Sequence, residues 1–155
     1  MKNLYLILLL GFSCSLFSCK DDDPTPPPSP PQSTIPTTAS SRLLVNKSWK
    51  LASFTKSGKP ENLVTELPAC QKDNFYIFSQ TAQLRVDEGK ATCIPSTAGQ
   101  SPWAFKDNEK VLNMSVPNLD AYGLAGDFDV DSLGASVLVL TKKDGTTSYK
   151  AIFNL

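Results

Sequence analysis

The sequence contains no histidine among its 155 residues. Histidine is the commonest general base and metal ligand in proteins, and it completes the Ser-His and Cys-His pairs of many hydrolases. Its absence excludes those pairs and leaves carboxylates, lysine, tyrosine and serine for any catalysis. Glycine-rich phosphate loops, Walker motifs and Gly-x-Ser-x-Gly motifs are also missing. We therefore expect a binding module that is not an enzyme, with no cofactor and no metal.

The sequence also lacks an excess of charge and a long apolar run. Its 15 basic residues balance its 15 acidic ones, so there is no electrostatic case for a nucleic-acid partner. The apolar run Leu4 to Phe12 is too short for a membrane-spanning helix, which needs about twenty residues. A basic start and a short apolar core are instead typical of a secretory signal peptide, which we place at residues 1–18.

The end of this segment resembles a bacterial lipobox. Leu16-Phe17-Ser18-Cys19 has a branched apolar residue three positions before a cysteine and a small residue directly before it. The resemblance implies cleavage before Cys19 and attachment of a lipid that carries acyl chains such as palmitate. Cys14 is the competing site, but Gly11 stands where the branched residue belongs. An ordinary secretory signal is the other interpretation of 1–18.

An acidic run and a proline-rich stretch follow, and we assign 19–41 to an anchor and linker. Lys20, Asp21, Asp22 and Asp23 resemble the signal that exports some lipoproteins to the cell surface, although a solvated charge run is the simpler interpretation. Seven of the twelve prolines lie between Pro24 and Pro36, which favours an extended spacer. An SH3-type ligand is the rival interpretation of the prolines. The expected localisation is the outer membrane, lipid-anchored and exposed at the cell surface.

Residues 42–155 have the composition of one folded domain. One or two helical turns are expected over 42–48. Apolar and polar residues then alternate with period two in short segments separated by turn residues, the clearest turn being Asp144-Gly145. Near 49–54 this alternation places Trp49 and Leu51 on the face opposite to Phe54. The segments are 49–54, 74–80, 82–86, 103–105, 112–116, 128–130, 136–142 and 149–155. About eight strands at this spacing predict an antiparallel sandwich or barrel.

The order of several motifs resembles the small lipocalin-like domains of Bacteroides-type surface lipoproteins. These motifs are "LLVNKSWKLAS", "ACQKDNFYIF", "DEGKATC" and "SPWAF". The resemblance implies an all-β fold, a small antiparallel up-and-down barrel, after a short N-terminal helical turn. It also implies a domain that binds a small hydrophobic ligand.

Cys70 and Cys93 are the two cysteines of the folded part, and an exported protein meets an oxidising compartment. We expect them to form a disulfide; a reactive thiol or a metal pair is the alternative. The alternating Asp127, Asp129 and Asp131 are the wet face of a strand, or a calcium site. The pairs Glu61/Glu66 and Asp87/Glu88 are the basis of a remote alternative, a carboxylate-based hydrolase.

Three functions follow for the domain. The first is a carrier whose pocket takes a small hydrophobic molecule, and it requires a barrel cavity of at least about 300 Å³. The second is a non-enzymatic adaptor or structural component of a cell-surface protein complex, which requires a filled barrel and an exposed apolar patch. The hydrolase is the third. The candidate pocket residues are Trp49, Phe75, Ile77, Leu84, Trp103, Phe105, Met114, Phe128, Tyr149 and Phe153.

Overall fold

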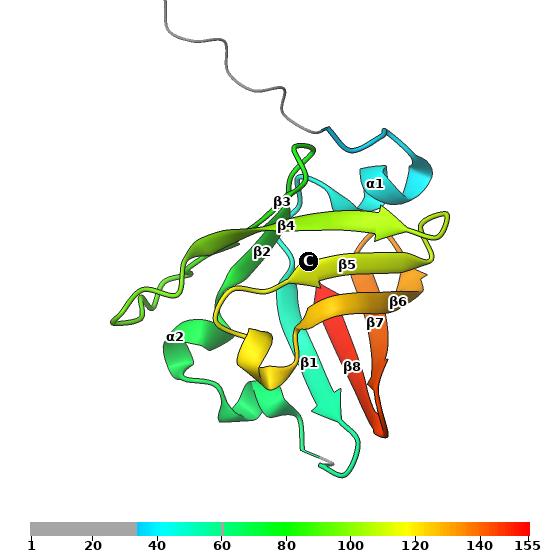
Figure 1. The fold of residues 1–155 in the computed structure, drawn as a ribbon. Coiled ribbons are helices and arrows are strands. Elements are labelled where there is room, and N and C mark those ends of the chain that lie inside the picture. Colours follow the sequence, from blue (N-terminus) through cyan, green and yellow to red (C-terminus); the bar gives the residue numbers. More distant parts are fainter. Residues whose placement is uncertain (1–33, 60) are drawn as a thin grey trace, which may run out of the picture. The chain divides into compact units, whose positions relative to one another are not determined.

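Eight antiparallel strands and four short helices make up the protein in a computed structural model, which describes residues 34–59 and 61–155 (Figure 1). The strands are β1 (Lys50–Lys56), β2 (Phe75–Phe78), β3 (Gln83–Asp87), β4 (Gly99–Lys106), β5 (Val111–Ser115), β6 (Ala125–Leu133), β7 (Val137–Asp144) and β8 (Thr147–Asn154). The helices are α1 (Ala39–Leu44) and α2 (Ala69–Lys72), with 3₁₀ turns η1 (Leu63–Glu66) and η2 (Asp120–Tyr122). No helix within these ranges is long and apolar enough to cross a membrane.

The strands form one sheet that curls into a nearly closed barrel. Their order is β1-β8-β7-β6-β5-β4-β3-β2, and every neighbouring pair is antiparallel. A bridge between Trp49 and Tyr76, with N···O distances of 3.0 and 2.8 Å, joins the two edges of the sheet. This confirms the predicted all-β, up-and-down barrel of eight strands.

The barrel has two different ends. At one, the helix end, α1 lies beside the short turns β2–β3, β4–β5 and β6–β7 (Figure 1). At the other, the loop end, lie the long connections 57–74, 88–98 and 116–124 and the tight β7–β8 turn. The predicted Asp144-Gly145 hairpin forms this last turn, in which Asp144 pairs with Thr147 and Gly145 has φ +58°.

Residues before 42 already pack on the barrel at the helix end. The Ile35 N–H donates to Gln80 O at 2.9 Å, and Asn46 N–H to Phe78 O at 2.8 Å. Helix α1 begins earlier than the expected 42–48 because Thr38 and Ser41 form a reciprocal capping box. The N-terminal segment thereby covers the outer edge of β2.

A β-bulge in β1 changes which residues face the core. The register to β8 shifts between Leu51 and Ser53, so Ala52 is the extra residue and Phe54 joins Leu51 in the interior. The predicted placement of Phe54 opposite Leu51 is therefore wrong.

Beyond the Trp49–Tyr76 bridge, β1 separates from β2, so that the edge of β1 has no neighbouring strand. One side chain forms hydrogen bonds to this edge. Asn62 Oδ1 accepts the Phe54 N–H at 2.9 Å, and its Nδ2 donates to Ala52 O at 3.2 Å. Asn62 Oδ1 also accepts the Val64 N–H at the start of η1. The connection after β1 is therefore attached to the strand edge by one amide.

Candidate functional site

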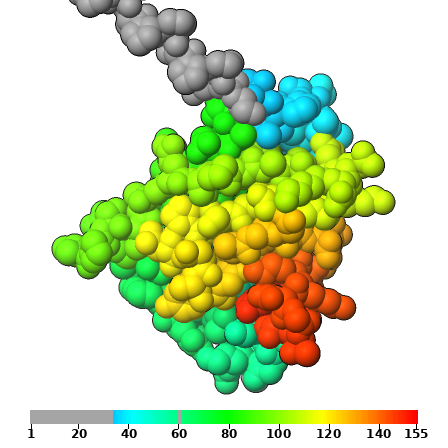
Figure 2. All heavy atoms as spheres, viewed as in Figure 1, coloured from blue at the N-terminus to red at the C-terminus, as the bar shows by residue number. Residues whose placement is uncertain are grey.

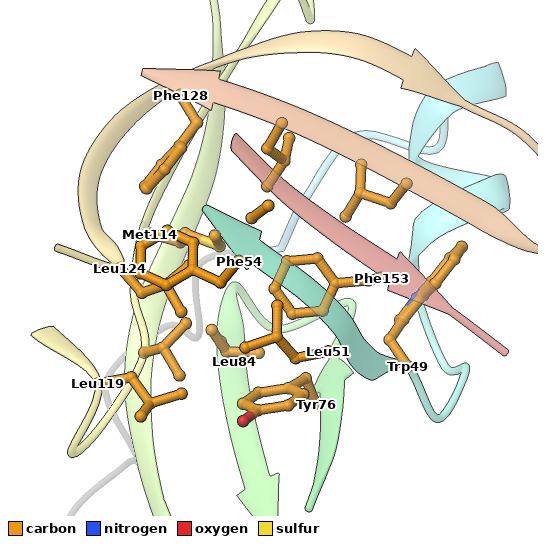
Figure 3. Close-up of a cluster of buried hydrophobic side chains, with 14 of the residues drawn as sticks. Trp49, Leu51, Phe54, Tyr76, Leu84, Met114, Leu119, Leu124, Phe128 and Phe153 are labelled. Carbon is orange, nitrogen blue, oxygen red and sulfur yellow. The ribbon is translucent and has the colours of Figure 1, made fainter. Parts of the chain in front are cut away.

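Most of the predicted pocket residues lie inside the barrel, as Figure 3 shows for part of the set. The buried members are Trp49, Leu84, Trp103, Met114, Phe128, Tyr149 and Phe153. Phe105 is partly buried and packs against them at the helix end. These residues face the barrel interior from the strands, or from just before β1 in the case of Trp49, and they form part of its hydrophobic core.

These side chains pack against one another. Tyr76 meets Phe153 edge to face with ring centroids 5.5 Å apart, and Phe78 meets Trp103 in the same way at 5.4 Å. Both indole N–H groups are used by backbone carbonyls: Trp49 donates to Leu44 O at 2.9 Å and Trp103 to Ser79 O at 3.2 Å. Burial raises the pKa of the Tyr76 hydroxyl above its ordinary value.

Phe75 and Ile77 do not share this interior with the other candidates. In β2 the inward residues are Tyr76 and Phe78, and strand alternation turns Phe75 and Ile77 to the outer face, where both are half-buried. The Lys50 ammonium lies 4.7 Å from the Phe75 ring centroid and covers part of it. The two residues are thus corrected from pocket lining to outer surface.

The apolar crevice at the loop end is small. It lies where η1 and η2 cover the barrel, and it leaves no room for a water molecule. Its lining residues are Leu51, Phe54, Leu63, Val64, Leu67, Leu119, Tyr122 and Leu124. Sequence reasoning missed this set because it depends on the β1 bulge and on two connections that fold back over the barrel.

The predicted disulfide is confirmed. Cys70, in α2, is bonded to Cys93, in the β3–β4 loop, with their Cα atoms 5.2 Å apart. The bond joins two connections of the loop end that are separated by 23 residues in sequence. The loop of residues 88–98, called the tip loop below, projects from the barrel (Figures 1 and 2).

Two carboxylates accept hydrogen bonds from the tip loop: Glu88, at its start, and Asp73, at the end of α2. Glu88 Oε1 accepts the N–H of Thr97 at 2.6 Å and that of Cys93 at 3.3 Å, and it also accepts the Thr97 hydroxyl. These bonds, chiefly the one from the Thr97 N–H, hold the pKa of Glu88 below its ordinary value. Asp73 Oδ2 accepts the N–H groups of Lys90 and Ala91 at 2.7 and 3.1 Å.

Gly89 fits closely over Asp73 in this arrangement. A Cβ at position 89 would lie 2.5 Å from the backbone oxygen of Asp73, closer than any side chain tolerates. Glycine is therefore required here by space. The loop is held by the disulfide, by both carboxylates and by this contact.

The braced tip loop presents one large apolar side chain to solvent. Ile94 is 99% exposed, compared with 54% for Leu155, 41% for Tyr122 and 38% for Val137. Beside it lies an open surface hollow of about 400 Å³. The hollow is lined by Pro68, Cys70, Gln71, Cys93, Ile94, Pro95, Ser96, Thr97, Asn118 and Tyr122, none of which is charged. Sequence reasoning missed Ile94, although an isolated isoleucine in "ATCIPSTAG" is a signal that could have found it.

The three aspartates of β6 face solvent. Asp127 forms an ion pair with Lys106 at 2.8 Å and accepts a hydrogen bond from Asn113. The hydrogen bond from Lys106 is the main cause that lowers the pKa of Asp127. Asp131 accepts the Thr141 hydroxyl at 2.9 Å. Within residues 34–59 and 61–155, no three His, Cys, Asp or Glu side chains gather as a metal site.

The predicted anchor lies outside the described residues. This applies to the signal peptide 1–18, to the lipidation site Cys19 and to the export signal Lys20 to Asp23. Comparison with protein-family models, curated proteins and solved structures found no match to this chain.

Proposed function

We propose that the protein is a lipid-anchored lipoprotein of the outer membrane whose lipocalin-like barrel acts as an adaptor at the cell surface. It catalyses no reaction and binds another cell-surface protein through the tip loop. The observation that carries this proposal is Ile94, a fully exposed aliphatic side chain on a loop held by a disulfide and two carboxylates.

The energetics of Ile94 favour a contact with a partner. Burying an isoleucine side chain contributes about 1.5 to 3 kcal/mol, and Ile94 gains none of this within its own chain. A loop that is already ordered loses little entropy on binding, which raises the affinity that one anchor side chain can give. The uncharged hollow around Ile94 suits a partner surface that is apolar and uncharged.

The packing of the barrel favours an adaptor over a carrier. A drug-sized ligand needs a pocket of about 300 Å³ or more, whereas the crevice under η1 and η2 leaves no room even for a water molecule. Trp49, Phe128 and Phe153 are each 0% exposed and fill the space that a guest would need.

The anchor is proposed from sequence. Cys19 at the exit of the signal peptide carries the lipid, Lys20 to Asp23 direct export, and the proline-rich linker holds the domain away from the membrane.

Site-specific photo-crosslinking in host cells tests the adaptor. A photoreactive residue at position 94 should give a discrete crosslinked product, and one at Leu155, exposed at the opposite end of the barrel, should not. The crosslinked partner should co-purify with the wild-type protein and with Leu155→Lys. It should not co-purify with Ile94→Lys, although this variant is folded. Identical patterns at both positions, or no product at position 94, would count against the proposal.

Carriage of a small hydrophobic ligand is the second candidate, and the apolar crevice at the loop end favours it. The guest would have to displace η1 or η2 to enter. Tryptophan emission titrated with fatty acids, sterols, haem and aromatic dyes tests this function. A saturable change that Leu63→Glu abolishes supports the carrier, and unchanged emission with every ligand removes it.

A further inference from the structure

Three buried side-chain oxygens make no hydrogen bond within the described part of the protein. They are Gln71 Oε1, Asp73 Oδ1 and Asn74 Oδ1. Folded proteins leave few buried polar atoms unpaired, and each exception points to a ligand, an ion, a water molecule or strain. Here all three lie within four consecutive residues, at the junction of α2 and β2.

The bonding around Asn74 fixes which of its atoms is unpaired. The Thr97 hydroxyl donates its single hydrogen to Glu88, so it can only accept from Asn74. The Asn74 nitrogen therefore faces Thr97, and the oxygen is the atom left over. Asn74 is 3% exposed, so this oxygen has exchanged water for the protein interior.

The three unpaired atoms are acceptors, and one belongs to a charged group. Asp73 makes no ion pair with any described residue: the two ion pairs there are Arg85–Asp87 and Lys106–Asp127. Its other oxygen is held by the Lys90 and Ala91 N–H groups, which fixes the carboxylate. A water molecule donates hydrogens and brings no charge, whereas a cation also balances the charge of the carboxylate.

We propose that Gln71, Asp73 and Asn74 contribute side-chain oxygens to a calcium site at the base of the tip loop. One carboxylate and two amide oxygens are ligands that Ca²⁺ accepts, together with water or backbone carbonyls. Zinc and copper prefer imidazole and thiolate, and the nearest sulfur atoms, those of Cys70 and Cys93, are tied in the disulfide. Two of these three residues are amides, so the set differs from a cluster of His, Cys, Asp or Glu ligands.

Calcium at this position would link α2 and the start of β2 to the tip loop. Asp73 and Asn74 are the residues that bond to Lys90, Ala91 and Thr97 of that loop. Binding would therefore stabilise the loop with its disulfide. A calcium site at these oxygens is independent of the proposed adaptor function.

Calorimetric titration of the chelator-stripped full chain with CaCl₂ tests the site, with thermal unfolding as a second readout. We expect saturable binding in the range of about 10⁻⁵ to 10⁻³ M and a rise in Tm with added calcium. Asp73→Asn should weaken binding at least about tenfold. The matched control Asp129→Asn, which removes an exposed carboxylate of β6, should leave the affinity unchanged.

Asp73→Asn could weaken calcium binding only because it disturbs the tip loop, to which Asp73 is hydrogen-bonded. A second variant tests the site without this effect. Gln71→Met keeps the length of the side chain and removes its oxygen, so it should weaken calcium binding while raising the Tm of the metal-free protein. No heat and no change in Tm up to about 10 mM calcium overturns the proposal. Wild-type affinity in both Asp73→Asn and Gln71→Met also overturns it.

Discussion

At the scale of single residues, Asn62 shows how one side chain can stabilise the edge of a strand. Its amide donates and accepts as a peptide group does, so it pairs with Ala52 and Phe54 where β2 has moved away from β1. Asn62→Ala leaves both backbone groups without these partners and frees the start of η1. We expect a loss of about 1 to 2 kcal/mol in the free energy of unfolding.

Urea unfolding followed by tryptophan fluorescence measures this loss. Gln100→Ala removes an exposed amide from β4 and serves as the control, with an expected change below about 0.5 kcal/mol. Equal effects of the two substitutions would show that the Asn62 bonds do not stabilise the barrel.

Glu88 gives the tip loop a dependence on pH. Its folded-state pKa is lowered, so its contribution to stability is present above the ordinary pKa and is lost as the pH falls through the folded-state pKa. Glu88→Gln should therefore lower Tm at pH 7, and the difference from wild type should shrink below about pH 4. Asp129→Asn, which removes an exposed carboxylate of β6, is the control and should lower Tm at pH 7 by less than Glu88→Gln does. A difference in Tm that is constant with pH would contradict the assignment.

At the scale of the elements, the disulfide connects α2 to the tip loop. In the chain-entropy model, closing the 23-residue separation contributes roughly 3 kcal/mol by restricting the unfolded chain. The double variant Cys70→Ser and Cys93→Ser should lose about this much stability in urea unfolding. It should also lose the crosslink from position 94, because Ile94 directly follows Cys93. Retention of both properties would show that the carboxylates alone hold the loop.

The strands could be predicted from sequence because their signal is local. Period-two alternation and turn residues specify each strand, and the Leu112–Met114 and Phe128–Val130 patterns correspond to β5 and β6. The β1 bulge could not be predicted, since it depends on register with β8, about a hundred residues away. Helices α2, η1 and η2 were missed because segments of three or four residues have no helical period.

Only part of the candidate site could be predicted, because some of its features depend on contacts between residues far apart in sequence. The two cysteines were found by composition and compartment. Phe75 and Ile77 were placed in the pocket because "FYIF" is apolar on both faces, and only pairing decides which face turns inward. The exposure of Ile94 depends on the bonds of Glu88 and Asp73 to the loop, which involve residues up to 18 positions apart.

At the scale of the whole molecule, the proposed anchor decides where the domain works. If Cys19 carries the lipid, Cys19→Ala should move the protein from the membrane fraction to the soluble fraction of host cells. Cys14→Ala is the matched control and should stay in the membrane fraction. Mass spectrometry of the mature protein should find an acylated N-terminal Cys19. An unmodified cysteine there would refute the anchor.

We propose that the acidic run Lys20 to Asp23 directs display of the domain on the outer side of the membrane. Replacement of Lys20 to Asp23 by alanine should preserve acylation and hide the protein from protease added to intact cells. Alanine substitution of Gln32, Ser33 and Thr34, in the linker, is the control for a loss of side chains there without a change of charge. If the protease cleaves the variant as readily as the wild type, the acidic run is only part of the linker and not an export signal.

The separation of β1 from β2 also bears on whether two copies of the protein can pair edge to edge. A strand edge with free N–H and C=O groups is a template for pairing with a second chain, and β1 has such an edge from Leu51 to Thr55. Asn62 occupies the middle of that edge and η1 covers it. If the proposed lipid anchor confines the protein to a membrane, its copies meet often, and Asn62 blocks edge-to-edge pairing between them by occupying this edge. Light scattering of Asn62→Ala should accordingly rise with protein concentration under conditions in which Gln100→Ala stays clear.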